Sequence, residues 1–363
     1  DNWYEVTDVL REHNVQCVMG GHYHRNLVFD CDGITDVLNR SNLRDKDGSN
    51  GYSIICVTDS IRFYERRLGE EAKGEMREAK GERREAKEAW LSLPFGKKEY
   101  GPSDEALRPD FSVNEQYKNV RRVWHQSLKG GIYSTPVTDG ESLYIGDDIG
   151  RFYSMNIKTG ETRWSFDTGM RIVGSPAVAD GVVVFGSANY NIYGLDAKTG
   201  KELWHVTTQQ AVMGAATIYE GVAYIGGGDG KMYAIDIHSG SIRWTFDELK
   251  NYVLTRPLVY KDKLYFGAWD TYFYALNLKD GQLAWKWNNG KRNNQLGPGN
   301  VVPVVLDDKV IVVAPDRFMT AIDRKTGKTI WRNKDHKYRE SLGVSNDRTR
   351  VYAKTMDGEL VAV

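Results

Sequence analysis

The sequence has few cysteines, no excess of charge and no long apolar run, and each absence excludes something. Its three cysteines, Cys17, Cys31 and Cys56, cannot all pair within the chain, so we expect small buried thiols rather than a disulfide framework. The 49 basic residues match 49 acidic ones, which argues against nucleic acid or an anionic membrane as a partner. No run of about 18 apolar residues occurs, so no transmembrane segment is predicted.

The chain is long enough for two domains, with 363 residues. It opens with Asp1 rather than Met, and no signal peptide precedes this residue. We therefore expect either a processed chain or a piece of a longer protein, and we favour the piece. The cysteines leave the compartment open.

A repeated phrase organises the C-terminal two-thirds of the sequence. It consists of a glycine, an apolar-aromatic run, a turn, Asp or Asn, Thr-Gly and then Trp, and Gly221–Trp244 is its clearest copy. The recurring tryptophans are separated by 40, 40, 40, 41 and 46 residues: Trp124, Trp164, Trp204, Trp244, Trp285 and Trp331. Spacing of this kind indicates an array of repeats.

Each repeat contains four short runs in which apolar and polar residues alternate. In the first complete repeat these runs are Ile132–Val137, Ser142–Ile145, Phe152–Ile157 and Thr162–Phe166. Units of about 40 residues with four strands are typical of β-propeller blades. The sequence therefore predicts a mainly β fold, with a β-propeller over residues 120–363 and six recognisable blades.

Turn residues recur at fixed places in these repeats. Four residues before the glycine of each third turn stands an Asp or Asn whose side chain can accept backbone N–H groups: Asn156, Asp196, Asp236, Asn277 and Asp323. In the second turns we interpret Asp148, Asp229 and Asp270 as turn residues rather than metal or quinone ligands.

The phrase A-x-D-x-x-T-G-x-x-x-W, clearest at Gly194–Trp204 and Ala321–Trp331, resembles the tryptophan-docking motif of the quinoprotein-like (PQQ-like) propellers. This resemblance implies that all six repeat tryptophans are structural and wedge between blades. It does not imply a bound quinone, because the propeller here contains no cysteine, whereas the methanol-dehydrogenase type has an adjacent cysteine pair. No PQQ is therefore expected. Non-catalytic relatives, including the outer-membrane assembly propeller, use the blades as a binding surface.

Binding residues in such a propeller are expected near the innermost strands and in long connections. Arg171 and Arg256 precede innermost strands and are candidates to receive an anion. Arg292 and Asn300 lie in the connection 288–300, which accounts for the longer last interval. These four residues are the predicted partner- or ligand-binding candidates, with a solvated connection as the alternative for the last two.

The ends of the array permit two interpretations. The last unit starts near Ser341 and stops before a fourth strand, while Val120–Leu128 has the pattern of a fourth strand without the first three. In one interpretation the two ends pair and close a six-bladed ring. In the other, which we favour, the array is truncated from seven or eight blades.

The first 67 residues read as a different, α/β unit. A helix is predicted around Val6–His13 and a strand at Val15–Met19, followed by Gly20-Gly21 and two histidines, His22 and His24. A pair of imidazoles in this pattern is either a metal-ligand pair or solvent-facing. Further strands are expected at Tyr52–Thr58 and Ser60–Tyr64.

The run VQCVMGGHYHRN resembles the last metal-binding motif, Gly-His-x-His, of the calcineurin-like metallophosphoesterases. The resemblance implies that His22 and His24 bind divalent metal ions in a two-metal centre. The earlier motifs of that family do not occur in this sequence, so the chain supplies a minority of the ligands that such a centre needs. We expect residues 1–67 to be the C-terminal portion of a metallophosphoesterase domain, inactive alone, and assign no catalytic residue.

A charged segment separates the two parts. The seven-residue period that begins at Glu71, EAKGEMR-EAKGERR-EAKEAWL, predicts a linker helix over residues 68–93. Glycines and prolines, including Pro94 and Pro102, then predict an irregular linker over 94–119.

The leading hypothesis is a metallophosphoesterase-associated protein whose propeller recognises a protein or phosphoester. The alternative is a non-catalytic interaction scaffold, and a quinone-dependent dehydrogenase is less favoured. The propeller resemblance weakly favours a periplasmic or extracellular location.

Overall fold

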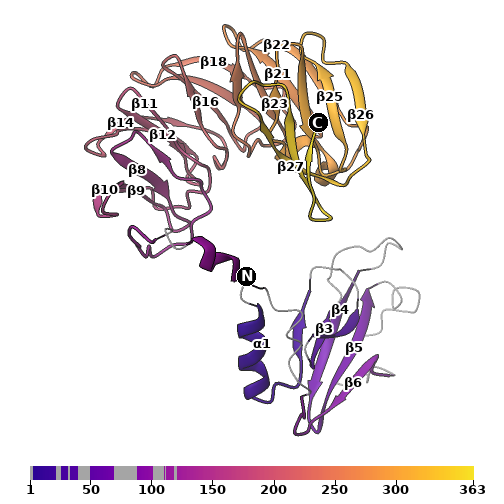
Figure 1. The fold of residues 1–363 in the computed structure, drawn as a ribbon. Coiled ribbons are helices and arrows are strands. Elements are labelled where there is room, and N and C mark those ends of the chain that lie inside the picture. The colour runs from indigo at the N-terminus through magenta and orange to yellow at the C-terminus, as the bar shows by residue number, and fades with distance from the viewer. Residues whose placement is uncertain are drawn as a thin grey trace, which may run out of the picture. The chain divides into compact units, whose positions relative to one another are not determined.

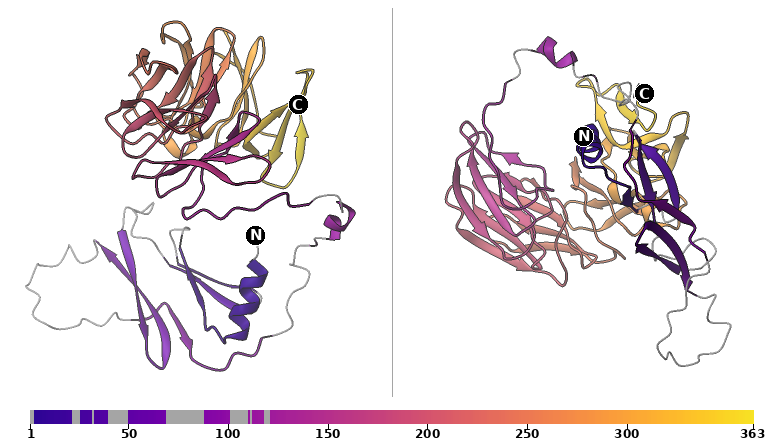
Figure 2. Two further views of the ribbon diagram at one scale, coloured as in Figure 1. Left: turned by 90° about the vertical axis from the view of Figure 1, so that its left-hand side faces the viewer. Right: turned by 90° about the horizontal axis from the view of Figure 1, so that it is seen from below.

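The computed structural model describes residues 3–21, 26–31, 33–39, 50–68, 88–100, 110, 112–117 and 121–363. The chain forms two compact units, Asp1–Val120 and Arg121–Val363 (Figures 1 and 2). No helix among these described ranges is long and apolar enough to cross a membrane.

The first unit begins with the predicted helix and a small sheet. Helix α1 spans Trp3–Glu12, and strands β1 (Val18–Gly20), β2 (Leu27–Cys31) and β3 (Ile34–Leu38) form a sheet in the order β1-β3-β2. β1 and β3 are parallel, whereas β2 and β3 form an antiparallel hairpin. The hairpin turns at Gly33, which has a φ of 80° and donates its N–H to Asp30 Oδ1 at 2.8 Å.

A second sheet of this unit corrects one prediction. Strands β4 (Asn50–Val57), β5 (Ser60–Leu68) and β6 (Leu91–Pro94) pair in that order, all antiparallel. The predicted linker helix was placed over 68–93, but Leu91–Leu93 lie in strand β6. The alternation of Leu91 and Leu93 with polar residues lets them pack against Phe63 in the unit's core. Residues 69–87, which carry the first two heptads and the start of the third, lie outside the described residues.

The second unit consists of six sheets. In Figure 1 they follow one another in chain order along a curved row, from the purple strands near β8 to the yellow ones near β27. Each of the first five sheets has four antiparallel strands, and the last has three. The strands are β7 (Val137–Thr138), β8 (Ser142–Gly146), β9 (Arg151–Asn156) and β10 (Thr162–Asp167); β11 (Ala177–Ala179), β12 (Val182–Gly186), β13 (Asn191–Asp196) and β14 (Glu202–Thr207); β15 (Thr217–Tyr219), β16 (Val222–Gly226), β17 (Met232–Asp236) and β18 (Ile242–Phe246); β19 (Leu258–Tyr260), β20 (Lys263–Gly267), β21 (Tyr272–Asn277) and β22 (Leu283–Asn288); β23 (Val304–Val305), β24 (Lys309–Val313), β25 (Met319–Asp323) and β26 (Thr329–Asn333); β27 (Tyr338–Val344), β28 (Val351–Thr355) and β29 (Leu360–Ala362).

This arrangement confirms the predicted blades and explains their apolar runs. The second and third strands of a blade are buried on both faces, as the five consecutive buried residues of β12 show. Each large buried cluster takes its side chains from two neighbouring sheets. Val184 of β12 packs in one cluster with Ile225 of β16, and Tyr265 of β20 packs in another with Val312 of β24. The hydrophobic core of the propeller therefore lies between blades.

Two further expectations differ from the structure. Val120–Leu128 has the sequence pattern of a fourth strand, but residues 121–128 form no strand, and the last sheet contains only β27, β28 and β29. The cysteines are less buried than expected: Cys17 and Cys31 are half-buried, and Cys56 is exposed on β4.

Candidate functional site

The repeat tryptophans join each blade to the next. The indole N–H groups of Trp164 and Trp204 donate to the carbonyls of Ala197 (3.1 Å) and Ile237 (2.6 Å), each just after the third strand of the following blade. The same bond runs from Trp124 to Ile157, from Trp244 to Leu278 and from Trp285 to Arg324. Among the described residues Trp331 makes no such bond, and it packs against the cluster between the last two sheets.

Glycine is required where each docking indole lands. The glycines of the third turns have φ values of 71–75°, and an added Cβ at Gly200 would lie 2.5 Å from the Trp164 ring. On the tryptophan side, a β-bulge interrupts the pairing of third and fourth strands, as between Gly194 and Leu195. The bulge turns the indole away from its own sheet and toward the next blade. The constant spacing between the Thr-Gly turn and the tryptophan in each repeat is therefore explained by packing between blades.

Four of the five predicted turn residues accept backbone N–H groups as expected. Asp196 Oδ1, for example, accepts the N–H of Thr199 at 2.7 Å, and Asn156, Asp236 and Asp323 act in the same way. The Arg243 guanidinium and the Ser239 N–H hold the pKa of Asp236 well below its usual range. Asn277 differs, because its side chain makes no hydrogen bond within the described structure.

The blades present two different edges. We call connection edge the one formed by the second turns and by the segments that lead from each fourth strand to the next blade. Backbone bonds tie these parts together, such as Thr168 N–H to Gly150 O and Thr208 N–H to Tyr190 O. The opposite edge, formed by the first and third turns, is the Thr-Gly edge.

Along the connection edge, an acid or amide holds a tyrosine hydroxyl in the first four blades. Asp229 Oδ2 accepts the Tyr233 hydroxyl at 2.6 Å, and Asp270 Oδ2 accepts that of Tyr274 at 2.7 Å. Burial first, and then the neighbouring carboxylate, raises the pKa of both tyrosines. In the first blade this role belongs to the buried Asp147 rather than to Asp148, whose Oδ1 instead accepts the N–H of Gly131.

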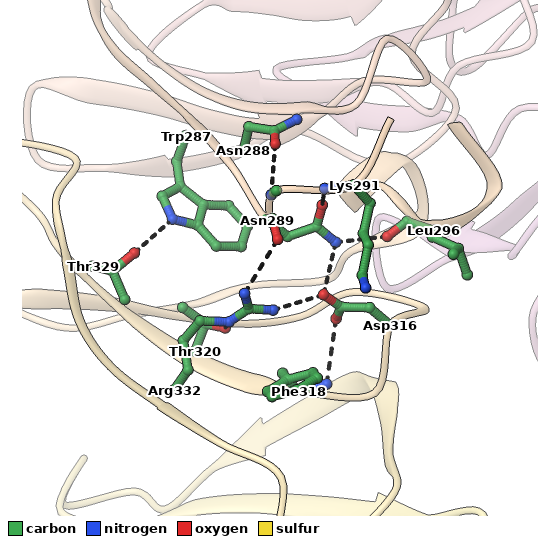
Figure 3. Close-up of polar contacts among 11 residues, drawn as sticks. Trp287, Asn288, Asn289, Lys291, Leu296, Asp316, Phe318, Thr320, Thr329 and Arg332 are labelled. Atoms are coloured by element: carbon green, nitrogen blue, oxygen red, sulfur yellow. Dashed lines mark hydrogen bonds and ion pairs between the residues drawn. The ribbon is translucent and has the colours of Figure 1, made fainter. Parts of the chain in front are cut away.

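The fifth blade replaces this pair with a charged cluster, shown in Figure 3. The tyrosine position is Thr320, and the Asp316 carboxylate accepts Nη2 of Arg332 at 2.6 Å and Nδ2 of Asn289 at 2.9 Å. The Asp316 side chain is only 2% exposed. The Arg332 guanidinium lies over the Phe318 ring, 4.4 Å from its centroid, and also donates to the Asn289 carbonyl.

This cluster fixes the long connection between the fourth and fifth blades. Asn289 Nδ2 also donates to the Leu296 carbonyl at 2.7 Å, and its Oδ1 accepts the N–H of Lys291 (Figure 3). Two short 3-10 helices follow, η3 (Asn294–Leu296) and η4 (Pro298–Asn300). The side chains of Arg292 and Asn300, two predicted binding candidates, are exposed on this anchored segment.

The other two candidates do not form one anion site. Arg171 is exposed on the connection edge, six residues before β11. Arg256 stands two residues before β19, and its Nη1 and Nη2 donate to the carbonyls of Ala216 (2.6 Å) and Pro176 (3.0 Å) in the two preceding blades. Burial lowers the pKa of the Arg256 guanidinium. Both arginines precede an innermost strand, so their sequence positions alone could not predict that Arg171 is exposed and that Arg256 is bonded to carbonyls.

Exposed apolar side chains occur along the connection edge, in the first two blades, in the connection before the fifth blade and in the last sheet. Five of them are 37–53% exposed: Ile149, Met170, Tyr190, Leu296 and Met356. On the Thr-Gly edge, exposed large apolar side chains include Tyr219 at the end of β15 and Ile242 at the start of β18. Large exposed apolar groups that share one surface are typical of protein-binding sites.

The predicted metal ligands cannot be placed. His22 and His24 lie outside the described residues. Among the residues that are described, no group of three or more His, Cys, Asp or Glu side chains is arranged to hold a metal ion.

The blades and their docked tryptophans define a quinoprotein-like (PQQ-like) repeat β-propeller. The family model described as "Outer membrane protein assembly factor BamB" matches residues 116–246, 213–297 and 287–363, and the chain belongs to this family. No curated protein matches the sequence.

Two solved structures show a similar fold. One is BamB from Moraxella catarrhalis, with a TM-score of 0.52 and 20% identity over 66% of this chain and 85% of that chain. The other is the quinohemoprotein alcohol dehydrogenase ADHIIG from Pseudomonas putida HK5, with a TM-score of 0.52 and 15% identity over 64% of this chain and 52% of that chain. At these identities the likeness concerns the fold alone.

Proposed function

We propose that the propeller is a protein-recognition module and that the connection edge is its binding surface. The observation that carries this proposal is the exposure of Ile149, Met170, Tyr190, Leu296 and Met356 at turns and connections of that edge. Apolar anchors of this kind supply most of the binding energy at protein interfaces. The family description supports a protein partner that takes part in outer-membrane protein assembly. We propose a periplasmic location on the same ground.

The anchored connection 289–300 gives this surface a preformed part. Because Asp316 and Arg332 already hold Asn289, the loop loses little further freedom when a partner binds. The exposed side chains of Lys291 and Arg292 add positive charge beside Leu296. Such charge speeds association with an acidic surface and selects against basic ones.

The test is partner capture by the full chain from a periplasmic extract, with the captured proteins quantified by mass spectrometry. The variant Met170→Ser/Tyr190→Ser removes two anchors of the connection edge. The matched control, Leu203→Ser/Ile330→Ser, changes two side chains of similar exposure (47% and 50%) on fourth strands. We expect the first variant to lose most of the captured protein and the control to retain it. Equal capture by both variants would refute the assignment of the surface.

A second proposal concerns the first unit and is supported by the Gly-His-x-His motif alone. We propose that His22 and His24 bind a divalent metal ion and that the chain lacks phosphoesterase activity by itself. Metal analysis of the purified chain tests this, with His22→Ala/His24→Ala as the comparison. Bound metal that is lost in the double variant supports the proposal, and absence of metal contradicts it. Metal-dependent hydrolysis of a phosphodiester, abolished by His24→Ala, would contradict the expected inactivity.

A further inference from the structure

A groove on the Thr-Gly edge lies between the third and fourth blades. It has a volume of about 770 Å³, within the range of ligand sites, and Tyr219, Tyr224 and Trp244 supply its aromatic lining. Trp244 is the docking tryptophan of this junction, with its indole bonded to the Leu278 carbonyl. The groove is therefore built on the rigid joint between two blades.

Two polar side chains of this groove make no hydrogen bond in the described structure. In the first blade the hydroxyl of Tyr144 lies 2.8 Å from Asp139 Oδ2 and 3.0 Å from the Ala197 carbonyl. Tyr224 holds the same position in the third blade, yet its hydroxyl makes no hydrogen bond in the described structure, although the residue is only 3% exposed. It reaches the groove as an unpaired polar group on a buried ring.

Asn277 is the second of these side chains. Its four counterparts close their turns by accepting backbone N–H groups, as Asp196 does, whereas the Asn277 side chain makes no such bond and lines the groove. An amide offers both donors and an acceptor. The groove thus combines aromatic surface with two neutral, unengaged hydrogen-bonding groups.

The charges around the groove balance. Three cations and three anions line it: Arg243, Lys261, Lys279, Glu220, Asp262 and Asp280. A lining without net charge favours a ligand without net charge. A charged ligand would lose hydrating water on binding, and no opposite net charge in the groove would replace that interaction.

We propose that this groove binds a neutral, amide-bearing peptide segment of the partner protein. The hydroxyl of Tyr224 and the amide of Asn277 hydrogen-bond its backbone or its Asn and Gln side chains, and the aromatic rings cover its apolar atoms. This inference rests on the proposed protein-recognition function and adds a second contact on the opposite edge. Two linked contacts bind more tightly than either alone.

Saturation-transfer NMR on the full chain tests the groove directly. The probes are the blocked peptides Ac-Gly-Asn-Gly-Gln-Gly-NH2, its acidic analogue with Asp and Glu, its basic analogue with Lys and Arg, and maltotriose. We expect the neutral peptide to bind in preference to the other three probes. Tyr224→Phe and Asn277→Asp each weaken its binding roughly two- to tenfold, the value of one hydrogen bond.

The variants are chosen to keep the fold. Tyr224→Phe removes a hydroxyl without a partner, and Asn277→Asp introduces the residue found at the equivalent positions 196, 236 and 323. The control Asn156→Asp makes the same change in the first blade, away from the groove, and leaves binding unchanged. Absence of binding to the neutral peptide, preference for a charged probe or for maltotriose, or unchanged binding in both variants would overturn the inference. If the peptide does not bind but partner capture still requires Met170 and Tyr190, then the groove inference is wrong while the proposed protein-recognition function stands.

Discussion

Removal of the Asp316 carboxylate is expected to release the long connection of the fifth blade. In Asp316→Ala, the Arg332 guanidinium and the Asn289 amide lose their shared acceptor in a site where the carboxylate side chain was 2% exposed. Breaking a buried ion pair costs about 3–5 kcal/mol, and we expect about 3 kcal/mol because Arg332 keeps some contact with water. The isosteric Asp316→Asn keeps one acceptor but loses the charge, and we expect about 1–2 kcal/mol.

Hydrogen exchange measured by mass spectrometry is the suitable assay, since a repeat array need not unfold in one step. A loss of about 3 kcal/mol accelerates exchange in the peptide 289–300 roughly a hundredfold, because each 1.4 kcal/mol is tenfold. The control is Asp307→Ala, which removes an ion pair with Lys261 of the same 2.6 Å length on the exposed surface. It should change exchange little. Equal effects of Asp316→Ala and Asp307→Ala would refute the anchoring role of the buried cluster.

Three further predictions concern the joints between blades. Trp204→Ala removes a buried ring and its hydrogen bond to the Ile237 carbonyl, and hydrogen exchange in β14 and β17 should show a loss of about 4 kcal/mol. A loss of about 0.5 kcal/mol or less, the size of an ordinary surface substitution, would contradict the docking role. Tyr144→Phe should lower the free energy of unfolding by about 1 kcal/mol because it removes the hydroxyl bonded at Ala197, whereas Tyr224→Phe should leave it almost unchanged, so equal losses would contradict this contrast. Burial raises the pKa of Tyr144 to about 12, above the value of about 10 in the unfolded chain, so its contribution to stability is complete below pH 10 and is lost as pH rises from about 10 to about 12. The late rise in tyrosinate absorbance should be smaller in Tyr144→Phe than in the wild type, while the part that comes from Tyr233 and Tyr274 stays. A difference between the two titrations that falls near pH 10 instead would contradict the prediction.

The periodicity of the repeats was sufficient to predict the blades, because burial on both faces forces apolar runs at fixed spacing. The second and third strands fall where the sequence places them, as β16 (Val222–Gly226) does in its repeat. The first strand of the first blade is shorter than predicted, Val137–Thr138 rather than Ile132–Val137, since Pro136 cannot donate to a ladder. Local sequence patterns therefore predict the presence of a strand better than they predict where it begins and ends.

The site was only partly predictable. The loop 288–300 stands out by its length, but its anchor, Asp316 with Arg332, was missed. The sequence did contain a signal. In earlier blades a tyrosine stands four residues after the acidic turn residue, as Tyr233 does after Asp229. In the fifth blade the residue four positions after Asp316 is Thr320. The unlike surroundings of Arg171 and Arg256, by contrast, depend on carbonyls from other blades, which no local pattern reports.

The docking of one tryptophan on the glycine of the next blade has a consequence for how such arrays grow. The two sides of the joint are different surfaces, so it is a head-to-tail contact in which every blade is both donor and receiver. A contact of this kind specifies the neighbour but not the number of neighbours. A blade carrying both halves, the turn with its glycine and the strand with its indole, can therefore be duplicated or deleted as a unit without any new interface having to arise.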